Sequence, residues 1–258
     1  MSPRKEVLAD GVEVWLGDCR EVLPMLAGVD IVITDPPYSS GARTDSERQV
    51  RGAMLRSMED NADWFSHDAM TTWGFNWFVR SVFSELRQRL PEGAHAYIFI
   101  DWRQTPNIYG MMEACGFRVN HCLVWDKGHF GMGAYWRNQH ENIVFASNGM
   151  PSPMLDRGMG SVIKCSGVSP TAREHPTEKP TDLLLTIIDA VPGDAIFDPF
   201  MGGGSTGLAA VRAGRGFVGC EINPAHFETA CRRISAELAR PRLALEIPPQ
   251  PKQESFAL

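Results

Sequence analysis

The chain has 258 residues, of which 43% are hydrophobic and 22% charged, a length that allows one large α/β domain with a substantial buried core. Its formal net charge of −6 is not typical of a protein that coats nucleic acid, although a local basic patch can still bind DNA. No apolar run approaches the roughly 20 residues of a membrane helix, no signal peptide is recognisable and the six cysteines form no Cys-x-x-Cys pair, so we expect a cytoplasmic protein with neither membrane contact nor bound metal.

The predicted strands and helices alternate along the chain. Short apolar runs predict seven strands, at Val12–Leu16, Ile31–Thr34, Ala94–Ile100, Val119–Trp125, Asn142–Ala146, Ala195–Asp198 and Phe217–Glu221. Helices are predicted at Trp77–Leu90, Ile108–Ala114, Thr181–Ala190, Ser205–Ala213 and Ala225–Ala239. This alternation is typical of an α/β fold with a doubly wound, mostly parallel, seven-stranded sheet and helices on both faces. We expect one domain over residues 1–240 and a proline-rich, poorly ordered tail at 241–258.

A carboxylate and two prolines directly follow the strand predicted at Ile31–Thr34. Asp35 would lie just beyond the carboxyl end of that strand, where open α/β sheets bind their ligands. Pro36 and Pro37 have no amide donor, so the segment offers only carbonyl acceptors, and Tyr38 adds an aromatic face. This combination suits a flat base that carries an exocyclic amine. The alternative is a Pro-Pro turn in which the tyrosine packs.

Two stretches without a regular pattern, at about 39–63 and 147–174, are candidate recognition segments for a substrate. The first contains four arginines with few acids nearby: Arg43, Arg48, Arg51 and Arg56. Arginines neutralise phosphates, so we expect these four to bind DNA. The alternative is a solvated loop.

A second site is predicted where the strand at Ala195–Asp198 breaks into a glycine turn. The run Phe200-Met201-Gly202-Gly203-Gly204-Ser205-Thr206 joins this strand to a helix, and its glycines let a ligand approach the backbone. The next strand ends in Glu221, which can accept both hydroxyls of a ribose. Gly202, Gly204 and Gly207 also match the dinucleotide fingerprint, so a nicotinamide dehydrogenase is an alternative. The position near the C-terminus and the bulky residues after Pro199 count against it.

Together the two sites resemble the circularly permuted β class of S-adenosylmethionine-dependent DNA amino-methyltransferases. In that family an Asp-Pro-Pro-Tyr motif precedes a Phe-x-Gly-x-Gly motif, as Asp35 to Tyr38 precedes Phe200 to Gly204 here. The resemblance extends from about Val12 to about Leu238. The family's cofactor turn usually reads Gly-Ser-Gly-Thr-Thr; the run Gly-Gly-Gly-Ser-Thr found here keeps a small residue or a hydroxyl at each changed position.

The resemblance implies S-adenosylmethionine as cofactor and double-stranded DNA as substrate. The implied cofactor-binding residues are Asp18, Asp35, Lys179, Asp198, Phe200, Gly202, Gly204, Ser205, Thr206, Glu221 and Asn223. In this set Asp18 would contact the cofactor's adenine and Glu221 its ribose. Lys179 would contact the cofactor's carboxylate, or would only introduce the helix that follows it.

The implied reaction is methylation of the N6 amine of an adenine that has left the duplex. Asp35 and the Pro36 carbonyl would accept hydrogen bonds from that amine, Pro37 would keep the segment rigid, and Tyr38 would stack on the base. In this family Asp before Pro-Pro-Tyr favours adenine over N4-cytosine, the nearest alternative. Protein glutamine methylation and a non-catalytic nucleic-acid-binding role are further alternatives. A homodimer and a paired restriction endonuclease remain open, and we expect His140 and Glu141 to be structural.

Overall fold

The structure, a computed structural model, describes residues 2–37, 72–131, 135–167 and 178–240. Within these ranges the strands are β1 (Arg4–Ala9), β2 (Val12–Leu16), β3 (Ile31–Thr34), β4 (His95–Ile100), β5 (Arg118–Asp126), β6 (His140–Ser147), β7 (Val162–Lys164), β8 (Ala195–Asp198) and β9 (Gly216–Glu221). The helices are α1 (Cys19–Val22), the 3-10 turn η1 (Leu23–Met25), α3 (Thr72–Arg89), α4 (Thr105–Ala114), α5 (Thr181–Ala190), α6 (Ser205–Arg212) and α7 (Pro224–Leu238).

The strands form one mixed sheet in the order β1-β2-β9-β8-β3-β4-β6-β5-β7. The run from β2 to β4 is parallel, whereas β6 lies antiparallel between β4 and β5, and β1 lies antiparallel to β2. All seven predicted strands are present, but the prediction of a seven-stranded, mostly parallel sheet was wrong. The additional strand β1 is largely exposed and β7 has three residues, so neither has the continuous apolar run of a buried strand.

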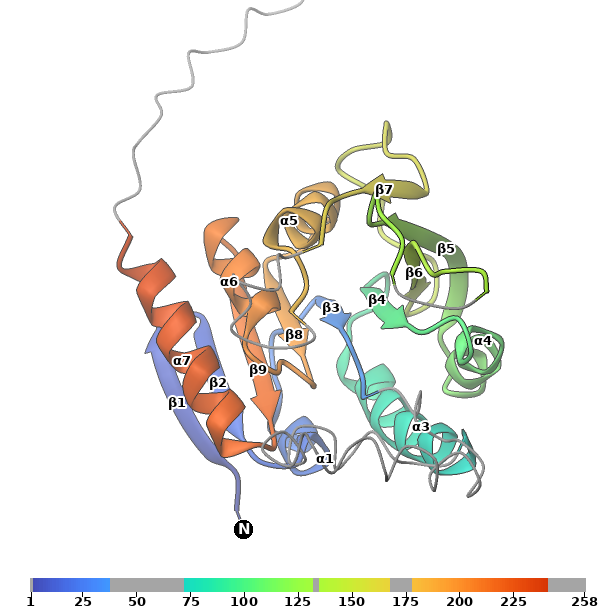
Figure 1. Ribbon diagram of the computed structural model, residues 1–258. Helices are drawn as coiled ribbons and strands as arrows, with labels where there is room; N and C mark the ends of the chain where they lie inside the picture. The colour runs from blue at the N-terminus through green and yellow to red at the C-terminus, as the bar shows by residue number, and fades with distance from the viewer. Residues whose placement is uncertain (1, 38–71, 132–134, 168–177, 241–258) are drawn as a thin grey trace, which may run out of the picture.

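Two apolar cores cover the two faces of the sheet, because alternate residues of a strand point to opposite sides. Val32 of β3 packs in the core with α1, α3 and α4, whereas Ile31 and Ile33 pack in the core with α5, α6 and α7. Figure 1 shows these two groups of helices on opposite sides of the strands. The described helices include none that is long and apolar enough to cross a membrane.

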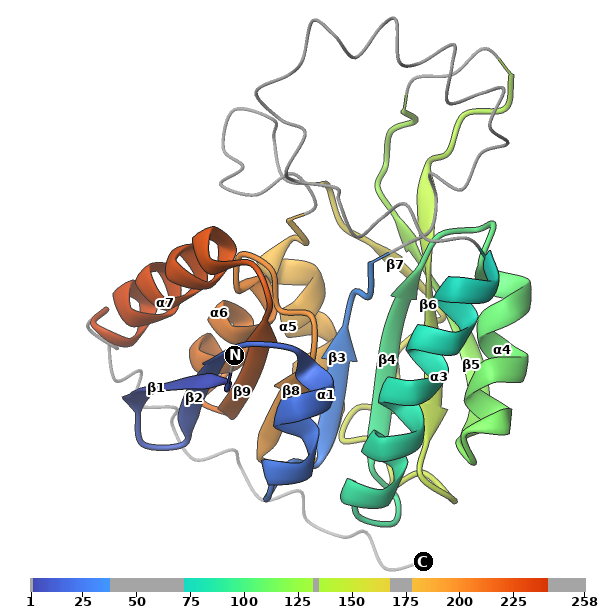
Figure 2. The same cartoon turned by 90° about the horizontal axis from the view of Figure 1, so that it is seen from below.

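The carboxyl ends of the parallel strands lie at one edge of the sheet, towards which the arrowheads of β3 and β4 point in Figure 2. Leu16 at the end of β2 pairs with Glu221 at the end of β9, and the Gly17 amide donates to the Glu221 carbonyl at 2.9 Å. The strand β2 therefore lies beside β9, the strand that ends in Glu221, although the two are far apart in the sequence. It brings Asp18 close to the glycine turn.

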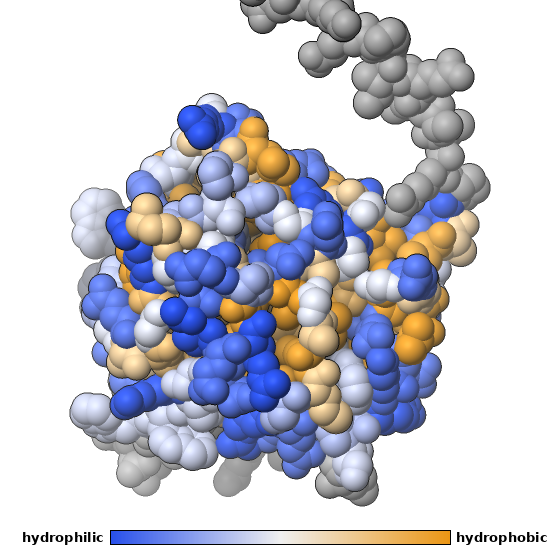
Figure 3. All heavy atoms as spheres, turned by 180° about the vertical axis from the view of Figure 1, so that it is seen from behind, coloured by the Kyte–Doolittle hydropathy of each residue, from blue (hydrophilic) through white to orange (hydrophobic). Residues whose placement is uncertain are grey.

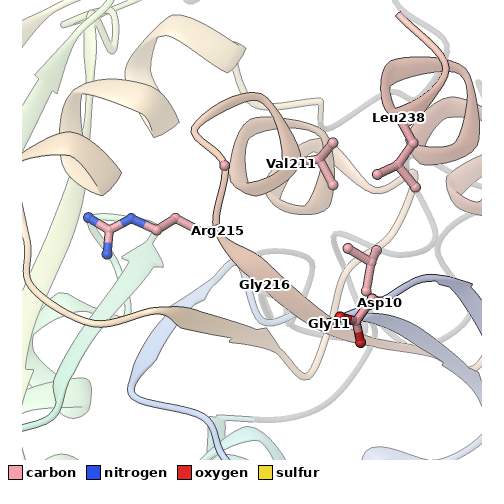
Figure 4. A pocket seen from close by; sticks show the side chains of 8 residues that line it. Asp10, Gly11, Val211, Arg215, Gly216 and Leu238 are labelled. Atoms are coloured by element: carbon pink, nitrogen blue, oxygen red, sulfur yellow. The ribbon is translucent and has the colours of Figure 1, made fainter. Parts of the chain in front are cut away.

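The opposite edge has a hollow of about 260 Å³ between the starts of β2 and β9 and the ends of α6 and α7 (Figure 4). The residues that line it are Asp10, Gly11, Val12, Val211, Gly214, Arg215, Gly216 and Leu238. Viewed from the side opposite Figure 1, the surface mixes hydrophilic and hydrophobic residues (Figure 3). The hollow contains none of the predicted site residues.

Candidate active site

A hydrogen bond joins the two motifs that the sequence separates. Thr34, the residue before Asp35, donates its hydroxyl to the Asp198 carboxylate at 2.7 Å, and the Phe200 amide donates to the same oxygen at 3.0 Å. Burial raises the pKa of Asp198 to about 6, although its hydrogen bonds with Thr206 and Thr34 act in the opposite direction. The end of β3 and the start of the glycine turn are therefore held together at the carboxyl edge.

The glycine turn needs its glycines for backbone conformation and for packing. Gly202 and Gly204 have positive φ angles of 51° and 81°, which side-chain-bearing residues rarely adopt. A Cβ on Gly204 would also lie 2.9 Å from the Cβ of Ala230, and one on Gly207 would lie 2.5 Å from the Cδ1 of Ile234. The turn and the start of α6 consequently pack directly against α7.

Glu221 lies at the end of β9 with both carboxylate oxygens bound to the turn. Its Oε2 accepts from the Gly202 amide at 2.9 Å, and its Oε1 accepts from the Asn223 amide at 2.8 Å. Burial raises the pKa of Glu221, while these amides lower it. The side chain of Asn223 caps α7 by accepting from the Ala225 amide at 2.9 Å, so this predicted cofactor ligand also has a structural task.

Asp18 lies at the start of α1, opposite an aromatic group. Its carboxylate caps the helix through the Arg20 amide and pairs with the Arg20 guanidinium at 2.5 Å, which lowers the pKa of Asp18. Arg20 lies over the ring of Phe78, 5.6 Å from its centroid, and Phe78 lies 5.6 Å from Phe200. Phe78 of α3, which was not among the predicted site residues, therefore shares a cluster with two predicted cofactor residues.

Four charged side chains form a row that ends at Asp35. The Lys179 ammonium lies 2.5 Å from the Asp35 Oδ2 and 3.2 Å from the Glu141 Oε2, and the Glu141 Oε1 pairs with Lys127 at 2.5 Å. The Lys179 side chain is only 9% exposed. Burial alone would lower its pKa, but the two carboxylates outweigh burial and raise it. Lys179 is therefore a permanent cation next to Asp35.

Glu141 belongs to the site, although it was expected to be structural. Burial raises its pKa, but Lys179 and Lys127 outweigh burial and hold the pKa below its usual value. Glu141 is the second residue of β6, which is antiparallel to its neighbours on both sides. No local signal in the sequence places this strand beside β4, so only the pairing of the strands reveals the contact.

The segment before α5 is also tied to the glycine turn. Arg233 of α7 donates to the Gly203 carbonyl at 2.7 Å and pairs with the Glu178 carboxylate. Both side chains of this ion pair are more than nine-tenths buried. Because Glu178 directly precedes Lys179, Arg233 holds both the glycine turn and the residue next to Lys179 in place.

Several predicted residues lie outside the described residues, so their roles stay predictions. They are Tyr38, Arg43, Arg48, Arg51 and Arg56, together with the segment 39–63, part of the segment 147–174 and the tail. In the described part of the second segment, β7 forms. Across the described ranges, no group of three or more His, Cys, Asp or Glu side chains could hold a metal ion.

The chain has relatives among known proteins. The chain matches the family N6_N4_Mtase, described as DNA methylase, over residues 29–232. It belongs to this family. The methylase YubD of Escherichia coli (strain K12) is 28% identical over 226 residues, covering 85% of this chain and 88% of YubD.

Solved structures show the same fold for this DNA methylase. The M1.HpyAVI complex with S-adenosylmethionine superposes with a TM-score of 0.66 at 19% identity, covering 86% of this chain and 98% of that one. The cytosine-N4-specific PvuII DNA methyltransferase superposes with a TM-score of 0.65 at 14% identity, covering 86% and 85%. Family membership favours a methyltransferase over the nicotinamide dehydrogenase considered from the glycine spacing.

Proposed function

We propose that this DNA methylase transfers the methyl group of S-adenosylmethionine to the N6 amine of an adenine in double-stranded DNA. The observation that supports this most is the 2.7 Å hydrogen bond between Thr34 and Asp198. It holds Asp35 and its two prolines beside the glycine turn, at the edge where open α/β sheets bind ligands. The acceptor segment for an amine and the glycine turn for a nucleotide thus lie at the same carboxyl edge of the sheet.

The residues at the glycine turn fit the cofactor. Positive φ angles at Gly202 and Gly204 leave a stretch of backbone without side chains. The Glu221 oxygens use one lone pair each on amides and keep lone pairs for two ribose hydroxyls. Phe200 adds an aromatic face and Asp18 a carboxylate for the cofactor's adenine. When bound, S-adenosylmethionine supplies a methyl group already activated by its positively charged sulfur.

Asp35 and the Pro36 carbonyl polarise the target amine. The amine lone pair of adenine is delocalised into the ring, and two acceptors for its two hydrogens draw the nitrogen towards tetrahedral geometry. Lys179 pairs with Oδ2 of Asp35 and so holds this carboxylate in place at the end of the proline segment. Asp35 acts as a hydrogen-bond acceptor for the amine in the transition state. After the methyl transfer, the positively charged amine nitrogen releases one proton to solvent.

Adenine is preferred over cytosine because Asp, rather than Ser, precedes the two prolines. The same two acceptors suit the N4 amine of cytosine, so N4-cytosine methylation is the second candidate. The experiment is to express the chain in a host without DNA amino-methylation and to sequence the host DNA with a modified-base readout. N6-methyladenine at a fixed sequence is expected. Detection of N4-methylcytosine instead would assign cytosine as the target base. Unmodified DNA in cells that express the wild-type protein would overturn the proposal. Cells that express the Asp35→Ala variant are the negative control.

A further inference from the structure

The chain between β5 and β6 exposes large aromatic side chains at the edge that contains Asp35. Its two arms, 127–131 and 135–139, are joined by hydrogen bonds from the Lys127 amide to the Gln139 carbonyl at 3.0 Å and from the Gly131 amide to the Asn138 carbonyl at 2.9 Å. β5 is parallel to β3 through β4 and β6, so this hairpin begins at the carboxyl edge. In Figure 2 both arms, in yellow-green, rise beyond the end of β3.

The aromatic side chains of the hairpin are unusually exposed. Trp136 is 101% exposed, Tyr135 93% and Phe130 54%. An indole left wholly in water is costly in apolar hydration, and exposed aromatic clusters mark interaction surfaces. The Arg137 guanidinium lies 3.6 Å from the centroid of the Phe130 ring, so a cation is fixed beside these rings.

A second pair of the same kind lies next to the hairpin. Trp102 follows β4, which pairs with β6, and is 54% exposed, with the Arg103 guanidinium 4.8 Å from its ring centroid. Arg103 also contacts the Asp101 carboxylate at 3.3 Å, so its charge is partly neutralised. We define the aromatic rim as Trp102, Arg103, Phe130, Tyr135, Trp136 and Arg137.

The charge of the rim fits a polyanion. Residues 127–140 include two cationic side chains and two histidines but no Asp or Glu, in a chain whose net charge is −6. The flanking carboxylates are already engaged: Asp126 accepts from the Gly128 amide and from Gln139, and Glu141 pairs with Lys127 and Lys179. Arginines beside exposed rings are the combination that binds nucleic acid, with phosphates on the cations and bases on the rings.

We infer that the aromatic rim is a duplex-DNA contact surface and that Trp136 stacks on a base left exposed when the target base leaves the helix. This inference rests on the proposed function. A base that moves to Asp35 leaves its neighbours in the strand with uncovered faces, and proteins that unstack DNA insert apolar side chains at such steps. The start of the hairpin is linked to Asp35 by the ion pairs of Lys127, Glu141 and Lys179, so the rim and the acceptor site lie on connected parts of the molecule.

A duplex with one central abasic position tests the inference without knowledge of the target sequence. The probe is fluorescein-labelled mixed-sequence DNA, intact or with the abasic position, and binding is followed by anisotropy. The wild-type protein is expected to prefer the abasic duplex. Trp136→Ala should lose that preference and bind about 10-fold more weakly, whereas Trp136→Phe should keep most of it because stacking needs a ring. Arg137→Ala should reduce the slope of log affinity against log salt by about one unit.

Two variants at the opposite end of the strands are matched controls. Arg118 is an exposed arginine at the start of β5, and Met25 is an exposed apolar residue 51% accessible in η1. Arg118→Ala and Met25→Ala should bind both duplexes as the wild type does. All these residues are exposed, so the melting temperature should change little in every variant.

The outcomes separate this inference from the proposed function. If the wild type methylates DNA but Trp136→Ala and Arg137→Ala bind both duplexes as the wild type does, the rim is not a DNA surface and the proposed function stands. If the two variants instead change only the concentration dependence of self-association, the rim is a protein interface and the inference is overturned. If the wild type neither binds nor methylates DNA, both proposals fall.

Discussion

The Lys179 ammonium lies 2.5 Å from the Asp35 carboxylate, joining the segment that precedes α5 to the residue that follows β3. Because Glu141 lies on the other side of this lysine, the cation is shared by two carboxylates. The two ion pairs hold the Lys179 ammonium beside Asp35, and its contact with the cofactor's carboxylate stays a prediction.

Replacing Lys179 with Met should lower kcat by about 100-fold, comparable to the loss of one preorganised donor, and should leave the cofactor Kd nearly unchanged. Lys179→Arg should retain more activity because it keeps the charge. Steady-state kinetics and titration calorimetry measure the two quantities. Lys5→Met, on the exposed strand β1, is the control. A large rise in cofactor Kd with normal kcat would instead assign Lys179 to the cofactor carboxylate.

Replacing Asp35 with Ala should abolish most methyl transfer while cofactor binding persists. The carboxylate acts on the amine mainly in the transition state, so a loss on the order of 10²-fold or more in kcat is expected, equivalent to roughly 3 kcal/mol. Single-turnover methylation of DNA measures the rate. A variant with near-normal turnover would show that Asp35 is not the acceptor.

Replacing Asp198 with Asn should change how stability depends on pH. Burial raises the pKa of this carboxyl from 3.8 to about 6, so between these values the folded protein binds more protons than the unfolded chain. The contribution of Asp198 to the free energy of unfolding is therefore fully present below about pH 4 and is lost as pH rises through about 6. Relative to wild type, Asp198→Asn should gain about 2 to 3 kcal/mol of unfolding free energy between about pH 4 and about pH 7.

Urea unfolding of the wild type and of Asp198→Asn across this pH range measures the difference in unfolding free energy. The contributions of the other carboxylates cancel because both proteins contain them. A parallel pH dependence in the two proteins would show that Asp198 is not the titrating group.

Replacing Gly204 with Ala should destabilise the protein by about 1 to 3 kcal/mol and weaken cofactor binding. Its φ of 81° is unfavourable for alanine, and the new Cβ would lie 2.9 Å from Ala230. Gly28→Ala is the matched control, since Gly28 has a φ of 69° but nothing within 4 Å of a new Cβ. The control should lose only the backbone part of the stability, about 1 kcal/mol, and none of the cofactor affinity.

Local patterns predicted the elements well and the contacts between distant residues poorly. The helix at Thr181–Ala190 was predicted with its observed bounds because its buried residues recur at helical spacing after Pro180. The glycine turn was recognisable because its constraints act within a few residues. The contact of Glu141 with Lys179 was not, because it depends on β6 entering the sheet beside β4 in the antiparallel sense. Likewise, β1 has too few buried residues to show a strand pattern.

The position of β8 and β9 has a consequence for how the chain folds. β2 and β3 follow one another in the sequence, yet these two late strands lie between them, and the Thr34–Asp198 hydrogen bond spans 164 residues. During synthesis the inner edges of β2 and β3 therefore stay unpaired until β8 and β9 are made. All four residues of β3 are buried in the finished protein, so a shortened chain would expose an apolar strand edge. A polypeptide that stops before Asp198 would accordingly have no methyltransferase site and would be prone to aggregate.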